Sequence, residues 1–124
     1  WEREILDRSL NVDGVDRPIY VIPGGQVMER MTAELSTLGG VSGLATYKDL
    51  FSDNIHFNDL GAYLIALTHY AVLYQKDPTG LPHELLKADR STADAPTPEA
   101  ARLMQQVVWD VVTGYRRSGV RRAT

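Results

Sequence analysis

Apolar residues recur along the chain at helical spacings, separated by loops rich in glycine, proline and polar residues. One such stretch follows Gly24 and Gly25 and ends before Gly39 and Gly40. Its apolar positions are Val27, Met28, Met31, Leu35 and Leu38. Residues three and four apart share one face of a helix, so this stretch predicts an amphipathic helix with one buried face.

Two further helices are predicted to begin at polar capping residues. Asn58 precedes a run to about Gln75 that is apolar almost all round, and this helix should be buried on most sides. Thr97 precedes Pro98 and Glu99, a pattern typical of the start of a helix. The apolar stripe of that last helix, residues 100–115, must pack against a partner surface.

The remaining segments divide the chain. Residues 1–10 carry Ile5 and Leu6 among charges and are interpreted as the end of a helix that begins earlier. The polar residues 83–96 are predicted to form one short helix followed by a linker. We therefore expect this linker to precede a C-terminal helix at residues 97–117.

The run "PIYVIP", Pro18 to Pro23, is the one segment with the composition of a strand. Its apolar side chains are consecutive rather than alternating, which is typical of a strand covered on both faces, as in a parallel sheet under helices. The backbone groups of a buried strand need partners. We therefore expect an α/β fold whose other strands lie outside these residues.

Composition limits the function. The chain has 124 residues, 44% of them hydrophobic, which suits one domain with a packed core. A net charge of −3 argues against a nucleic-acid partner, and the basic cluster at residues 116–122 is expected to lie favourably at a helix end. No apolar stretch is long enough to span a membrane. The chain has no cysteine, which excludes thiolate chemistry and leaves the compartment open, with export slightly favoured.

The stretch "LFSDNIHFNDLGAYL", residues 50–64, contains the candidate catalytic residues. Asp53 and His56 are three residues apart, so both side chains can lie on one side of a turn. A histidine held by a carboxylate is the base of serine hydrolases. The following helix N-terminus would keep the imidazole neutral. From spacing alone the alternative is structural, with Asp53 capping a turn and His56 bonded nearby.

No metal or cofactor site is expected. His56, His69 and His83 are 13 and 14 residues apart, and neither spacing matches a zinc motif. His69 is expected to pack within its helix, with one ring nitrogen hydrogen-bonded.

"RPIYVIPGGQVM" followed by "LFSDNIHFNDLGAYLIALTHYAVLYQKDPTGLP" resembles the C-terminal part of SGNH (GDSL-type) hydrolases, a family of esterases, lipases and carbohydrate deacetylases. The likeness covers roughly residues 17–82, and it implies that residues 1–124 are one partial domain with an SGNH-like C-terminal core at residues 17–82. It implies a three-layer α/β/α, flavodoxin-like fold with residues 18–23 as the last core strand. It also implies that Asp53 and His56 are the acid and base of the triad, with Gly61 opening the next helix, and that the reaction is hydrolysis of a carboxylic ester through a serine ester intermediate.

The family's Gly-Asp-Ser block and its oxyanion-hole glycine and asparagine have no counterpart here. The six serines all lack a preceding Gly-Asp, and Leu44 stands where a nucleophile elbow around Ser42 would need glycine. We therefore expect the nucleophile on an N-terminal segment preceding Trp1 or on a partner chain that completes the sheet, and a substrate of the acyl ester or O-acetyl sugar class. The alternative is a non-catalytic helical interaction domain whose stripe at residues 100–115 binds a partner.

Overall fold

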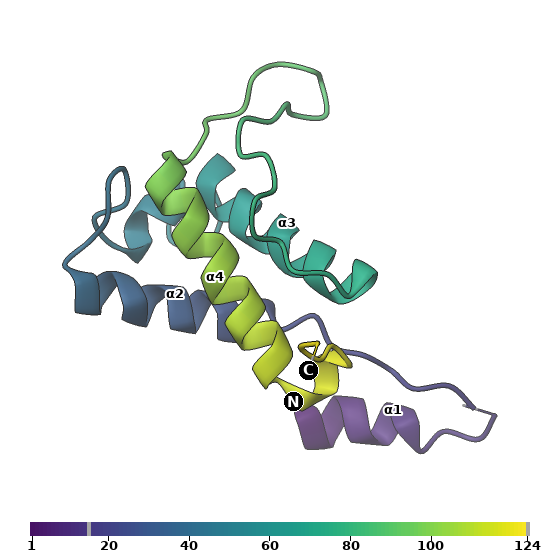
Figure 1. Cartoon of the computed structure of the whole chain (residues 1–124). Helices are drawn as coiled ribbons and strands as arrows, with labels where there is room; N and C mark the ends of the chain where they lie inside the picture. Colours follow the sequence, from purple (N-terminus) through teal and green to yellow (C-terminus); the bar gives the residue numbers. More distant parts are fainter. Residues whose placement is uncertain (15, 124) are drawn as a thin grey trace.

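The computed structural model describes residues 1–14 and 16–123, and within them the fold is helical (Figure 1). The α-helices are α1 (Arg8–Leu10), α2 (Gly24–Leu38), α3 (Asp59–Tyr74) and α4 (Pro98–Gly114). A π-helix, η1 (Glu2–Asp7), and two 3-10 helices, η2 (Tyr47–Leu50) and η3 (Arg116–Ser118), complete the helical segments. The described residues form isolated β-bridges but no strand.

The core lies where α4 packs against α2 and α3 (Figure 1). The side chains that α4 buries there are Ala100, Ala101, Met104, Gln105, Val107, Val108 and Val112. The expectation that this stripe packs against a surface is confirmed, and the surface belongs to the chain's own helices.

The predicted helix boundaries at Gly39, Asn58 and Thr97 are confirmed. Gly39 ends α2 in the left-handed conformation, with φ of +69°, which glycine adopts without steric cost. The Asn58 side chain caps α3. The Thr97 hydroxyl accepts the N–H of Ala100 at 3.1 Å and donates to the Ser42 carbonyl at 2.7 Å, so it both caps α4 and holds the loop after α2.

The predicted three-layer α/β/α fold is wrong for this chain, because no sheet forms in the described residues. Residues 18–23 lie outside the helices, and the Val21 N–H bonds the Arg117 carbonyl at 2.9 Å instead of a neighbouring strand. Pro18 and Pro23 have no N–H to offer a ladder. Tyr20 is exposed. Consecutive apolar residues are therefore a misleading signal here, because the described residues offer no strand to pair with them.

The short helix predicted after His83 is also absent. The segment turns back on itself through the bonds Lys87 N–H to Ser91 O, 2.8 Å, and Ala93 N–H to Leu85 O, 3.1 Å. One or two turns of helix form too few bonds to offset the entropy of nucleation, so a local hairpin is preferred.

The N-terminal helix, formed by η1 and α1, lies at the C-terminal end of α4, where Figure 1 shows both termini close together. The Tyr115 hydroxyl donates to the Glu2 carboxylate. The Arg117 guanidinium lies 3.0 Å from Asp7 and 3.6 Å from Glu2. Part of the basic cluster at residues 116–122 therefore pairs with acids of the first helix, an attachment that helix-end placement alone did not predict. None of the described helices is both long and apolar enough to cross a bilayer.

Candidate functional site

The structure brings Asp53 and His56 together in the turn that precedes α3. Asp53 Oδ2 lies 2.7 Å from His56 Nδ1. The other carboxylate oxygen, Oδ1, accepts the backbone N–H groups of Ile55 at 2.8 Å and His56 at 2.7 Å. All three contacts form within residues 53–56, so the backbone of the turn orients the carboxylate toward the ring.

These contacts keep the Asp53 side chain ionised. The N–H of Ile55, the N–H of His56 and then the imidazole ring lower the pKa of Asp53 below its ordinary value. Asp53 is therefore a carboxylate at neutral pH and can only accept hydrogen bonds. The neutral His56 ring must then carry its proton on Nδ1, which leaves a lone pair on Nε2.

The turn is closed by contacts at its base. Phe51 and Phe57 face each other through a β-bridge, with ring centroids 5.1 Å apart. The Ser52 N–H donates to the His56 carbonyl at 2.8 Å, and the Ser52 hydroxyl donates to the same oxygen at 3.2 Å. The Ser52–His56 loop is therefore defined by its own backbone bonds and by an aromatic pair beneath it.

The pair is open on its outer side. The side chain of His56 is 70% exposed and that of Asp53 is 54% exposed. A hollow of about 340 Å³ beside the turn is lined by Tyr47, Lys48, Phe51, Ser52, Asp53 and Asn54. No hydrogen bond among the described residues engages Nε2 of His56. The basic nitrogen is thus free to meet a group from outside these residues.

No serine of the described chain completes the pair. The hydroxyls of Ser9, Ser52, Ser91 and Ser118 donate to other groups, and no bond in the described segments joins a serine hydroxyl to the His56 ring. Ser42 offers its carbonyl to Thr97.

The other histidines lie apart from this turn. His69 on α3 bonds the Ile65 carbonyl through Nδ1 at 2.9 Å. His83 lines a separate hollow between α3 and the segment before α4. Within residues 1–14 and 16–123 no three His, Cys, Asp or Glu side chains are grouped to hold a metal ion.

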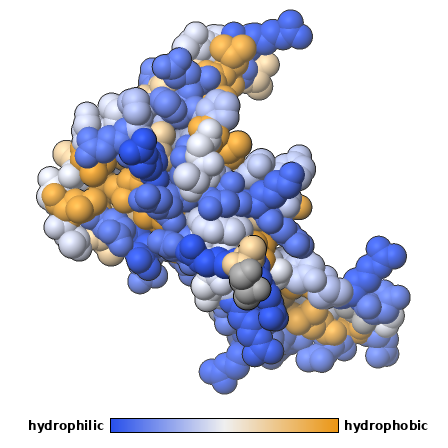
Figure 2. All heavy atoms as spheres, in the orientation of Figure 1, coloured by the Kyte–Doolittle hydropathy of each residue, from blue (hydrophilic) through white to orange (hydrophobic). Residues whose placement is uncertain are grey.

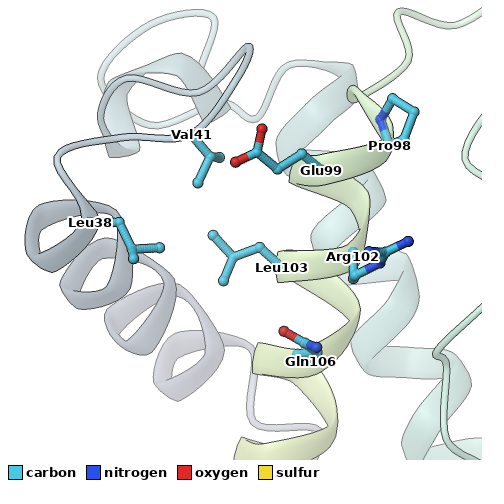
Figure 3. Close-up of a pocket in the computed structure, with 7 residues that line it drawn as sticks. All are labelled: Leu38, Val41, Pro98, Glu99, Arg102, Leu103 and Gln106. Carbon is cyan, nitrogen blue, oxygen red and sulfur yellow. The ribbon is translucent and has the colours of Figure 1, made fainter.

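A second hollow lies between the C-terminal end of α2 and the first turns of α4 (Figure 3). Its volume is about 340 Å³. Leu38, Val41 and Leu103 point into it, and the polar groups around it are those of Glu99, Arg102 and Gln106. Figure 2 shows apolar side chains gathered over this end of the molecule. The hollow has no hydroxyl, thiol or imidazole in its lining, so it lacks the groups that cleave an ester.

Comparison of the chain with protein-family models, curated proteins and solved structures finds no match. The assignment of function therefore rests on the Asp53–His56 geometry and on the sequence resemblance described above. One participant was missed at the sequence level. Asn58 was predicted only as a helix cap, yet its amide nitrogen also donates to the Asp49 carbonyl at 2.7 Å. Its place two residues after the histidine was the available signal.

Proposed function

We propose that Asp53 and His56 are the orienting acid and the general base of a serine ester hydrolase similar to the SGNH family. The observation that carries this proposal is the 2.7 Å contact of Asp53 with Nδ1, which leaves Nε2 of an exposed ring available. Here the bonded nitrogen is the one that a triad carboxylate binds.

The reaction follows from these roles. Nε2 of His56 takes the proton of a serine hydroxyl as its oxygen attacks the ester carbonyl, and the Asp53 carboxylate stabilises the imidazolium. The imidazolium returns the proton to the leaving alcohol. A water molecule then loses a proton to Nε2 and attacks the serine ester, and the imidazolium returns that proton to the serine oxygen as the carboxylic acid is released. The serine and the oxyanion donors come, in this proposal, from a further segment of the protein or from a partner chain.

The substrate class follows only from the resemblance, namely an acyl ester or an O-acetylated sugar. The described residues supply few of the groups that would select among these. The hollow beside Asp53 presents Tyr47 and Phe51, which suit an apolar acyl chain or the face of a sugar ring.

The experiment uses the longest open reading frame that contains these residues. The expressed protein should hydrolyse a short p-nitrophenyl ester, and His56→Ala should lower kcat/KM roughly 10³-fold or more. His69→Ala is the matched control, because His69 is also exposed but bonds only within its helix. Equal activity of the His56→Ala variant and the wild type would refute the proposal, as would absence of ester hydrolysis by the intact protein.

A further inference from the structure

The Asp53–His56 turn is attached to the core through its two ends, Leu50 and Phe51 before it and Phe57 and Asn58 after it. Asp53 and His56 are exposed, so they make no core contacts that could fix the loop in place. The chain enters the turn from η2 and leaves it into α3. Contacts that link these two helices therefore set where the turn lies relative to the core.

Asn58 makes that link with both ends of its amide. Its Oδ1 accepts the N–H groups of Leu60 at 3.0 Å and Gly61 at 3.1 Å, at the start of α3. Its Nδ2 donates to the Asp49 carbonyl at 2.7 Å and, at a longer 3.5 Å, to the Phe51 carbonyl. One half-buried side chain thus joins the exit of the turn to its entrance.

Two further contacts at the same place hold the entrance against the first turn of α3. The Asn58 N–H donates to the Leu50 carbonyl at 3.1 Å. Gly61 lets that carbonyl approach α3, because a Cβ atom on Gly61 would lie 2.2 Å from the Leu50 oxygen. The amide of Asn58 therefore lies beside a close backbone contact between Leu50 and the first turn of α3.

We infer that Asn58 is a positioning residue for the His56 base, acting through the geometry of the Ser52–His56 turn. This inference rests on the proposed catalytic role of His56. The donor half of the amide carries the positioning role, and the acceptor half caps α3. The two halves can be separated by substitution, since a capping oxygen needs no amide nitrogen.

The test is Asn58→Ser in the 124-residue chain. Serine keeps a capping oxygen but is too short and lacks the amide donor to reach the Asp49 carbonyl. The tautomer of His56 is measured from long-range ¹H–¹⁵N couplings, well above the ordinary imidazole pKa of about 6.5. The pKa of Asp53 is measured from its carboxyl ¹³C shift. We expect the variant to lose the Nδ1–H tautomer enrichment and the pKa of Asp53 to rise toward its ordinary value.

Thr97→Ala controls for loss of stability alone, because it removes the cap of α4 without touching the turn, and it should leave both readouts unchanged. An Asn58→Ser variant with the wild-type tautomer and the wild-type Asp53 pKa would overturn the inference. If Asn58→Ser fails to fold, Asn58→Asp is measured in the same way, since aspartate is also a strong cap.

The readout involves no substrate. An altered tautomer in a protein that proves to have no esterase activity would refute the proposed function alone. An unaltered tautomer alongside full esterase activity would refute the positioning role alone.

Discussion

The carbonyl oxygen of Leu50 occupies the space where a side chain on Gly61 would begin. An added Cβ atom would lie 2.2 Å from this oxygen and 2.8 Å from the ring of Phe57. Both distances are far below van der Waals contact, and one of the two atoms belongs to the backbone. The helix that follows the Asp53–His56 turn can therefore approach η2 this closely only with glycine at position 61.

Gly61→Ala should accordingly destabilise the protein by about 1–3 kcal/mol, because the backbone at Leu50 has to move. Urea unfolding followed by circular dichroism measures this. Gly25→Ala is the matched control, since a Cβ atom there meets nothing within 4 Å. We expect that control to be neutral or stabilising by up to about 1 kcal/mol. Equal stability of the two variants would show that the close contact is absent.

Gln105 joins the segment before α4 to the core, and its replacement should lower the stability of the protein. Its amide nitrogen donates to the Tyr63 hydroxyl and to the Leu81 carbonyl, both at 3.1 Å, and its amide oxygen accepts the Gly80 N–H at 2.9 Å. Gln105→Leu leaves these groups without their partner and should cost about 1–3 kcal/mol in the free energy of unfolding.

Gln106→Leu provides the comparison for that experiment, because Gln106 is the exposed neighbour of Gln105 on the same helix. We expect a change within about 0.5 kcal/mol. If Gln105→Leu is as stable as this control, the buried amide network does not hold residues 78–82.

The ionised form of Asp53 should contribute stability that depends on pH. Its pKa in the folded chain lies below the ordinary value of 3.8, so the contribution is fully present above pH 3.8 and is lost as the pH falls through the lowered pKa. Wild type should therefore exceed Asp53→Asn in stability above pH 3.8, and this margin should shrink as the pH falls further below 3.8. Denaturant midpoints at several pH values below 3.8 measure the margin. A margin that widens as the pH falls through this range would contradict the lowered pKa.

The hydrogen bond of Tyr115 to Glu2 should anchor the N-terminal helix up to high pH. Burial and then the Glu2 carboxylate raise the pKa of Tyr115 from 10.0 to about 12. Stability that depends on the neutral phenol is thus complete below pH 10 and is lost as the pH rises through about 12. Tyr115→Phe should speed amide exchange at Leu6 roughly two- to tenfold at neutral pH.

Tyr20→Phe tests whether any tyrosine hydroxyl near this end has the same effect, because the Tyr20 ring packs over Gly119 instead. Amide exchange at Leu6 should be unchanged in that variant. If exchange is equally fast in both variants, the N-terminal helix is held by Arg117 and not by Tyr115.

The helices of the core could be predicted because their signals are local. Helix starts are capped by Asn58 and Thr97, and α2 ends at Gly39, in each case through atoms within a few residues. Apolar side chains three and four residues apart must share a helix face. The same local reasoning predicted that the side chains of Asp53 and His56 could meet in one turn. These features depend only on residues that are close together in the sequence.

The failures concern segments whose structure depends on distant partners. Residues 18–23 have the composition of a strand, but a strand exists only when another segment pairs with it, and the Val21 N–H bonds Arg117 instead. The second role of Asn58 was missed for a similar reason, since its bond to Asp49 spans nine residues. Neither contact leaves a periodic trace in the sequence.

The Asp53–His56 pair needs no distant part of the chain to form. The acid, the base and the two backbone donors occupy residues 53–56, and the contacts that seat them lie within residues 49–61. Closing so short a loop costs little chain entropy. Residues 49–61 should therefore keep the orientation of the imidazole when they are inserted ahead of a helix in an unrelated protein. A chosen hydroxyl group of that protein could then be placed opposite the ring.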